Sequence, residues 1–362
     1  MSWKLKNKFL FSIVFLTVVL SKVNAQKKDT AKSFSAFPFP VVYYAPETRF
    51  VFGVGGVATF RPKKDGAEAR PSSITGGAAY TQNKQVLLYS TYQLFLDKNK
   101  YYIFGEAGYY IYSYFFFGTG QNEVPEELYR VTYPRIKLNA TRLVLPNLYA
   151  GLGYQYENYK ITETEANGAL AADSIPGSLG SRTSGLGLQF IYDKRDSVFY
   201  PRSGWYGQFN AMNNGKHWGG NFNFNRLILD VSKYQTIYKD IILAVNSYNS
   251  FVLGEAPFQQ QSQLGSNKQM RGYYQGRFTD KNLMALGAEA RFPIYRRFGG
   301  VVFANSGAIG NEQDFIRFND LKYSYGLGIR FNVNRRDHLN MRLDYALGPN
   351  TSGIYFTIGE AF

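Results

Sequence analysis

Leu321-Lys-Tyr-Ser-Tyr-Gly-Leu-Gly-Ile-Arg-Phe-Asn-Val333 is the stretch of sequence that decides the fold. Its odd-numbered residues are all aliphatic or aromatic, whereas its even-numbered residues are glycine, polar or charged. Side chains alternate between the two faces of a β-strand, so this period of two predicts a long strand with one apolar face. The segment 338–347 repeats the pattern, and its polar face carries Arg342 and Asp344.

Strand length distinguishes a soluble sheet from a membrane barrel. Strands in soluble proteins average about 5 to 6 residues, but a tilted strand needs about 9 to 11 residues to cross a bilayer. The segments 321–333 and 338–347 belong to the longer class. We therefore expect transmembrane strands that turn one face to lipid and the other to a wet lumen.

The overall composition excludes several other classes of protein. The 362 residues are 45% hydrophobic and 17% aromatic, which is too apolar for a disordered chain. The mean hydropathy of -0.29 is too low for a bundle of membrane helices. There are no cysteines, and the two histidines, His217 and His338, are far apart in a loop and at a turn. We therefore predict a protein that is not an enzyme, with no metal and no cofactor.

After residue 36 the alternation continues through the whole chain. It predicts sixteen strands, at 38–44, 49–60, 72–82, 86–96, 101–112, 129–143, 148–161, 182–193, 204–213, 221–236, 240–251, 283–293, 299–306, 321–333, 338–347 and 353–362. Mostly short connections alternate with longer ones at 113–128, 162–181, 252–282 and 307–320, as in outer-membrane barrels. The predicted fold class is all-β, a transmembrane antiparallel β-barrel over residues 37–362.

The N-terminus predicts export from the cytoplasm. Lys4, Lys6 and Lys8 precede a short apolar run at 9–20, and Ala25 provides a small residue for cleavage. We expect residues 1–25 to be a signal peptide and 26–36 a short periplasmic segment. The net charge of +15 comes from scattered single residues, which favours a charged lumen and contacts with outer-membrane lipid over nucleic acid.

The two ends of the barrel sequence are expected to meet. Ile354, Phe356, Ile358 and Phe362 alternate to the last residue and predict a closing strand. The strand predicted at 38–44 is short, and its prolines at 38 and 40 cannot donate to a ladder. The boundary between the first and last strands is therefore expected to be weak.

Two motifs narrow the class further. A charged turn follows the strand 182–193 and contains Asp193, Arg195, Asp196, Pro201 and Gly204, whose charges can pair locally. The longest connection, 252–282, contains Leu264-Gly-Ser-Asn-Lys-Gln-Met-Arg-Gly-Tyr273, with Arg271, Gly272 and Tyr273 at its tip. In this order and strand spacing, the two motifs resemble the BamA/TamA family of outer-membrane β-barrels, the bacterial surface-antigen superfamily. The resemblance covers the last half of the chain.

The resemblance implies a role and a set of contacts. It implies insertion, assembly or translocation of proteins at the outer membrane through a weak seam between the first and last strands. It also implies that the loop 252–282 folds into the lumen, where Arg271 meets Glu289 on the strand 283–293. Asn305 stands where the family commonly has an aspartate, so we expect it to be a neutral partner of the loop arginine.

One departure from the family leaves an alternative open. Residues 26–36 cannot hold a periplasmic POTRA domain, which the assembly barrels of the family usually carry. The expected partners are client outer-membrane proteins or separate periplasmic proteins. The alternative is a passive pore or structural barrel without client handling.

Overall fold

The computed structural model describes residues 34–45, 47–66, 69–120, 125–172, 174–311, 316–317 and 320–362. The predicted signal peptide, residues 1–25, lies outside the described residues, and so does most of the predicted segment 26–36. None of the helices in the described part is long and apolar enough to cross a membrane. The account below concerns the described residues.

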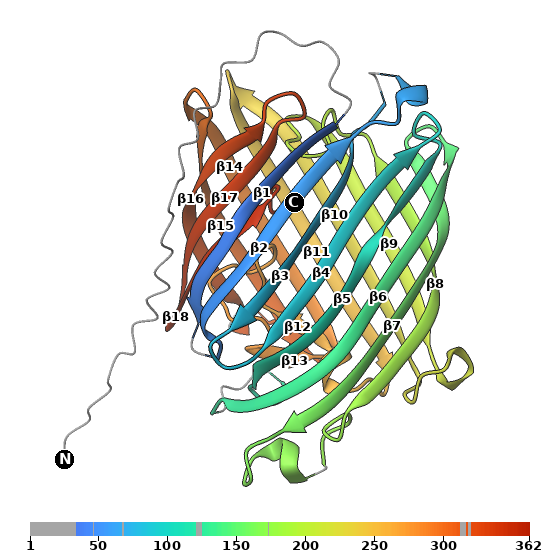
Figure 1. The fold of residues 1–362 in the computed structure, drawn as a ribbon, viewed down its shortest axis with the longest axis vertical. Helices are drawn as coiled ribbons and strands as arrows, with labels where there is room; N and C mark the ends of the chain where they lie inside the picture. Colours follow the sequence, from blue (N-terminus) through green and yellow to red (C-terminus); the bar gives the residue numbers. More distant parts are fainter. Residues whose placement is uncertain are drawn as a thin grey trace, which may run out of the picture.

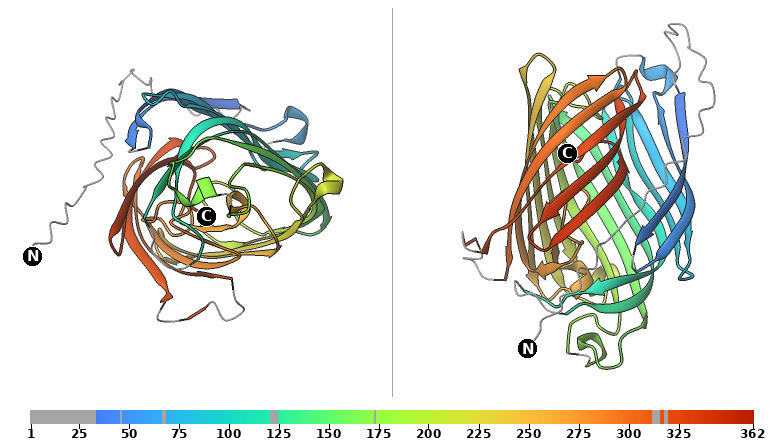
Figure 2. Two further views of the ribbon diagram at one scale, coloured as in Figure 1. Left: turned by 90° about the horizontal axis from the view of Figure 1, so that it is seen from below. Right: turned by 90° about the vertical axis from the view of Figure 1, so that its left-hand side faces the viewer.

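Sixteen antiparallel strands form one continuous sheet, as the sequence predicts. They are β1 (Phe34–Ala45), β2 (Arg49–Phe60), β3 (Ser72–Thr81), β4 (Val86–Leu96), β5 (Tyr101–Phe116), β6 (Glu127–Leu145), β7 (Leu148–Glu163), β8 (Ser181–Asp193), β9 (Gly204–Asn214), β10 (Phe224–Tyr238), β11 (Ile241–Gly254), β14 (Asn282–Tyr295), β15 (Phe298–Gly310), β16 (Lys322–Asn334), β17 (Leu339–Gly348) and β18 (Thr351–Ile358). Each strand pairs with the next of the sheet in chain order, and the sheet curves round into a barrel (Figures 1 and 2).

The two faces of the sheet differ in polarity, as the alternation predicts. On β16, Leu327 and Ile329 point outward and are 58% and 50% exposed, whereas Ser324 and Arg330 point into the lumen and are 2% and 3% exposed. Outward positions on the neighbouring β17 are also apolar, while its inward residues Arg342 and Asp344 are fully buried. The lumen side is therefore charged and tightly filled.

Small elements lie in the connections. The long connection between β11 and β14 contains a second, two-stranded sheet, β12 (Ser262–Leu264) with β13 (Phe278–Asp280), which the sequence analysis did not predict. Four short 3₁₀ helices complete the described elements: η1 (Lys63–Asp65), η2 (Ala169–Ala172), η3 (Lys216–Trp218) and η4 (Phe258–Gln260). In the view along the barrel, the connection between β11 and β14 lies inside the ring of strands (Figure 2).

The strands β1 and β18 are the two edges of the sheet. Within the described residues no ladder joins them, so the expected closing pair is not hydrogen-bonded. Their contact is aromatic instead, since the rings of Phe39 and Phe356 lie edge to face with centroids 6.1 Å apart. Phe39 is opposite Gly55 on the buried face of β2, and Phe356 follows Tyr355, whose hydroxyl reaches into the lumen. The lumen face of β1 therefore overlaps the outer face of β18.

Both edge strands differ from their predicted bounds. The first strand begins at Phe34, not at residue 38, because Pro38 and Pro40 lie within a ladder to β2 at the outer edge of the sheet, where proline is tolerated. The prediction that the last strand continues to Phe362 is wrong, since β18 ends at Ile358. Gly359 adopts a φ of 85°, a left-handed conformation that turns the chain out of the strand.

Candidate functional site

The candidate functional site is the lumen loop, residues 255–281 between β11 and β14, with the wall that holds it. Near its start, η4 packs against the wall formed by β5 to β7. The ring of Phe258 lies 5.0 Å from that of Phe116 and 5.5 Å from that of Tyr129. The side chain of Gln260 donates a hydrogen bond to Glu157 on β7 over 2.8 Å. The loop is thus anchored on one side of the barrel before it reaches its tip.

Arg271, at the tip of the loop, is held on the opposite wall. Its side chain has no exposed surface and forms ion pairs with Glu289 on β14 at 2.5 Å and with Asp344 on β17 at 2.6 Å. The guanidinium carbon also lies 3.5 Å from the ring centroid of Phe303 on β15, a close cation–π contact. Three wall strands therefore hold one loop side chain.

The two residues after Arg271 are fixed through their backbone and hydroxyl groups. Gly272 has a φ of 107°, and its N–H donates to the Tyr355 hydroxyl over 2.8 Å. Its carbonyl accepts a hydrogen bond of 2.7 Å from Thr351. The hydroxyl of Tyr273 donates to the Tyr323 carbonyl on β16 over 3.1 Å. Both Tyr355 and Thr351 belong to β18, so the loop tip bonds directly to the last strand.

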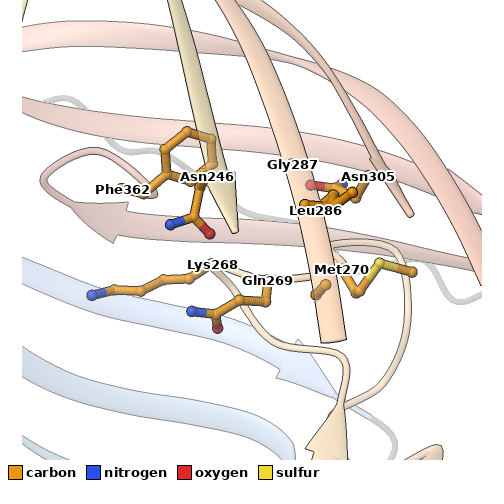
Figure 3. Close-up of a pocket in the computed structure, with 9 residues that line it drawn as sticks. Asn246, Lys268, Gln269, Met270, Leu286, Gly287, Asn305 and Phe362 are labelled. Carbon is orange, nitrogen blue, oxygen red and sulfur yellow. The ribbon is translucent and has the colours of Figure 1, made fainter. Parts of the chain in front are cut away.

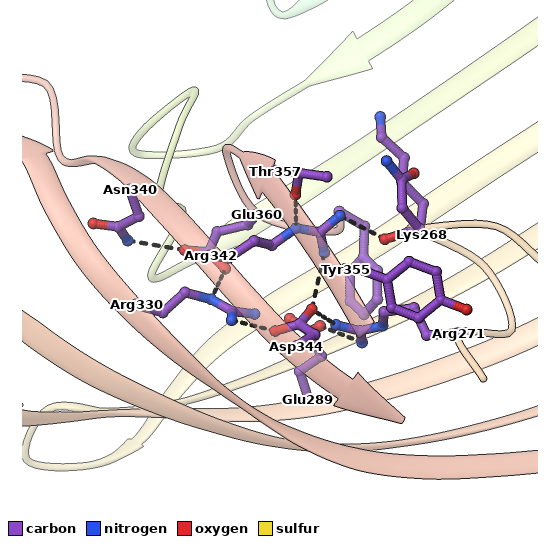
Figure 4. A network of polar contacts seen from close by, with 12 residues as sticks. Lys268, Arg271, Glu289, Arg330, Asn340, Arg342, Asp344, Tyr355, Thr357 and Glu360 are labelled. Carbon is purple, nitrogen blue, oxygen red and sulfur yellow. Dashed lines mark hydrogen bonds and ion pairs between the residues drawn. The ribbon is translucent and has the colours of Figure 1, made fainter. Parts of the chain in front are cut away.

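The arginine contacts continue as a network along the lumen wall (Figure 4). Asp344 accepts from Arg330 at 2.5 Å and from Arg342 at 3.4 Å, in addition to Arg271. Glu289 also pairs with Arg291 on its own strand at 2.8 Å. The carboxylates thus join four arginines, all at most 3% exposed. Removing a carboxylate would leave several buried cations without a full partner.

The residues after β18 join the same network. Glu360 pairs with Arg330 at 2.7 Å and accepts a hydrogen bond from Asn340 over 2.8 Å. Arg291 donates to the backbone oxygen of Phe362 over 2.8 Å. Phe362 lines a narrow recess with the loop residues Lys268, Gln269 and Met270 and with wall residues that include Asn305 (Figure 3). The loop and the end of the sequence therefore meet inside the barrel.

The predicted partners of Arg271 have different places in this site. Glu289 contacts the arginine directly, whereas the amide of Asn305 donates to Ser324 over 3.1 Å and forms no described bond with Arg271. The second acidic partner is Asp344, a role that the sequence analysis did not assign. Its signal in the sequence was a charged residue on the polar face of a strand, but nothing local indicated which lumen cation it meets.

The charged turn motif forms a separate cluster at the short-turn end of the barrel. Asp193, 2% exposed, accepts two hydrogen bonds from the Arg195 side chain, at 2.8 and 2.9 Å. It also pairs with Arg70, which comes from the distant β2–β3 connection and was not predicted. Asp196 accepts from the backbone N–H of Arg202 over 2.9 Å and of Ser203 over 3.2 Å. These contacts fix the turn.

The same turn contains the predicted Pro201 and Gly204. Pro201 precedes β9, which begins at Gly204 with a φ of 105°. A Cβ there would lie 2.0 Å from the Lys194 carbonyl oxygen, so only glycine fits at this position.

The two histidines lie outside both clusters. A ring nitrogen of His217 lies 2.9 Å from the side-chain oxygen of Asn213, and His338 is in the turn between β16 and β17. The described residues contain no group of three His, Cys, Asp or Glu side chains that could hold a metal ion.

Fold and site together define an outer-membrane-type β-barrel with a loop pinned in its lumen by a conserved-geometry arginine contact to the wall. A model of the Omp85 superfamily domain matches residues 73–362, and the chain belongs to this superfamily of outer-membrane barrels. Members resembling BamA and CdiB serve protein insertion or secretion in Gram-negative bacteria. No curated protein matches the chain in sequence.

Three solved structures share the fold. BamA from Haemophilus ducreyi lacking POTRA domains 1-3 is 13% identical with a TM-score of 0.56, over 91% of this chain and 69% of that chain. CdiB from Acinetobacter baumannii is 12% identical with a TM-score of 0.57, over 91% and 60%. CdiB from Escherichia coli is 11% identical with a TM-score of 0.54, over 90% and 62%. The chain thus spans less than two thirds of either CdiB chain.

Proposed function

We propose that this barrel inserts or translocates client proteins at the outer membrane through the boundary between β1 and β18. The observation that carries the proposal is the absence of a described ladder between these strands, while all other neighbours in the sheet are hydrogen-bonded. An edge strand with unpaired N–H and C=O groups can template the strand of another chain. The proposal includes no catalytic step and no cofactor.

The character of the β1–β18 contact supports a boundary that opens. Phe39 and Phe356 contact each other through their rings, and Phe37 and Ile358 pack against one shared apolar cluster. Apolar contacts of this kind are not directional, so the strands can slide apart without breaking a ladder of hydrogen bonds. Partner proteins are then the clients themselves or separate periplasmic proteins that deliver them.

Locking the boundary tests the proposal. The chain has no cysteine, so Phe39→Cys with Phe356→Cys can be joined by a short bismaleimide without background labelling. In cells that depend on this gene, the locked barrel should lower the levels of other outer-membrane proteins, because client strands no longer reach the β1 and β18 edges. The unlocked double variant should keep those levels normal.

A matched lock controls for the crosslink itself. Leu343 is directly opposite Phe356 in the β17–β18 ladder, so Leu343→Cys with Phe356→Cys locks two strands that are already paired. This variant should retain function. Normal levels of outer-membrane proteins in cells with a fully locked β1–β18 boundary would contradict the proposal and favour a passive or structural barrel.

A further inference from the structure

A polar pocket opens at the long-connection end of β9, β10 and β11, far from the lumen network in the sheet order. Its volume is about 420 Å³, and its lining is neutral, with Asn213, Asn214, His217, Asn223, Phe224, Asn225, Leu253 and Gly254. Pockets of this size accommodate small ligands. No acidic side chain lines it, so the chemistry of its ligand must suit amides and apolar surface.

Part of the lining lies on the outer face of the barrel. Asn213, Asn225 and Leu253 are direct neighbours in the ladders of three adjacent strands, and all three are exposed. Along the same face of β9 and β10 follow the exposed Phe209 and Leu229, which are also direct partners. Because asparagine is costly against hydrocarbon, the asparagine row marks the level of the lipid headgroups above an apolar belt.

The connection 215–223 forms a wall above this row. Asn221 and Arg182 exchange two hydrogen bonds of 2.8 Å, which tie the connection to the end of β8. The oxygen of Asn213 lies 2.9 Å from a His217 ring nitrogen and accepts from the Trp218 indole over 3.0 Å. These bonds hold two aromatic rings beside the pocket.

Two amide groups at the pocket keep their donors free. Asn225 uses only its oxygen, which accepts from Asn213 over 2.7 Å, and Asn223 uses only its oxygen, which accepts from the Lys216 N–H over 3.1 Å. Both side chains are exposed. Amides that donate and accept match hydroxyl groups, which also do both, while aromatic rings and leucine match the apolar faces of a sugar ring.

We propose that this pocket binds the sugar headgroup of a glycolipid in the outer leaflet of the membrane. The hydroxyl groups of the headgroup bond to Asn223 and Asn225, and the ring packs beside His217 and Trp218. The acyl chains run along the belt of Phe209 and Leu229. The site is independent of the lumen loop and of the proposed β1–β18 opening.

Tryptophan fluorescence reports on this pocket directly. After residue 25 the chain has only Trp205 and Trp218, so Trp205→Phe leaves one tryptophan beside the pocket. The full chain, folded in uncharged detergent, is titrated with purified lipopolysaccharide that lacks the O-antigen. The emission of Trp218 should change and saturate. Phosphatidylglycerol, which has no sugar ring, should give no saturating change.

Two variants in this background decide the assignment. Asn225→Leu keeps the bonds from Asn213 to His217 and Trp218, and it should weaken lipopolysaccharide binding about tenfold by removing one bonded amide. Asn158→Leu, on β7 outside the pocket, should leave binding unchanged. Heat-modified gel mobility verifies that both variants are folded. Unchanged affinity in Asn225→Leu, or equal saturation with phosphatidylglycerol, would overturn the proposal.

A third titration separates the two sources of the sugar. An acyl-free glucosamine disaccharide should bind in the same pocket, but more weakly than the lipid. If it binds as tightly as lipopolysaccharide, the lipid-borne assignment is overturned in favour of a soluble sugar.

Discussion

Arg271→Ala and Glu289→Ala should both destabilise the barrel, but to different extents. Neither side chain has exposed surface, and their ion pair is 2.5 Å long. Removing one partner of a buried pair costs about 3 to 5 kcal/mol, because an uncompensated charge remains. The position of each change within this range follows from the contacts that the other charges keep.

Without Arg271, both of its acidic partners keep a cation. Glu289 keeps Arg291, and Asp344 keeps Arg330. We therefore expect a loss near the lower limit, about 3 kcal/mol. Without Glu289, Arg291 retains only a 4.0 Å contact with Glu360, so the expected loss is near the upper limit, about 5 kcal/mol.

The double variant should lose less than the sum of the two single losses. Each single change already removes the same contact, so the coupling between them should be about 0.5 to 3 kcal/mol. Urea unfolding of the folded barrel in detergent micelles measures each free energy, followed by tryptophan fluorescence and by the mobility of unheated samples in gels.

A surface ion pair provides the control. Arg202 and Asp240 are also 2.5 Å apart, but they are 45% and 60% exposed. Arg202→Ala should therefore cost less than about 1 kcal/mol. Strict additivity in the Arg271–Glu289 cycle, or a loss in Arg271→Ala no larger than in Arg202→Ala, would refute the reasoning.

Three further predictions concern the barrel as a whole. Unheated and boiled samples should migrate differently in gels, since nearly all strands are paired on both sides; co-migration with a helical circular dichroism spectrum would contradict the fold. Asp344→Asn should lower the urea midpoint much more than Asn305→Ala, because three arginines contact Asp344 whereas the Asn305 amide donates one bond, to Ser324; equal midpoints would contradict this. Burial raises the pKa of Glu47 in the β1–β2 turn above its ordinary value of 4.5, so its contribution to stability is present below pH 4.5 and is lost as the pH rises through the raised pKa. Glu47→Gln should therefore gain stability relative to the parent at pH 8 but not at pH 4, and the same difference at both pH values would exclude a titrating Glu47.

The sequence by itself determined the strands, their number and their faces. Alternation is a local property of an extended chain, so each segment such as 321–333 carries the information about its own two sides. The same alternation placed Glu289 on the lumen face, and the motif at the loop tip indicated Arg271 as its partner. All of these inferences required only neighbours along the chain or a motif of a few residues.

Only the tertiary structure decided which distant groups meet. Arg271 and Asp344 are 73 residues apart, and their contact depends on how far the sheet curves before β17 faces the loop. The pairing of Arg70 with Asp193, 123 residues away, depends on the same closure. Alternation alone would have continued the last strand to Phe362. The chain turns at Gly359 instead, because buried arginines in the lumen bind the Glu360 carboxylate, and that attraction exists only once the barrel has formed.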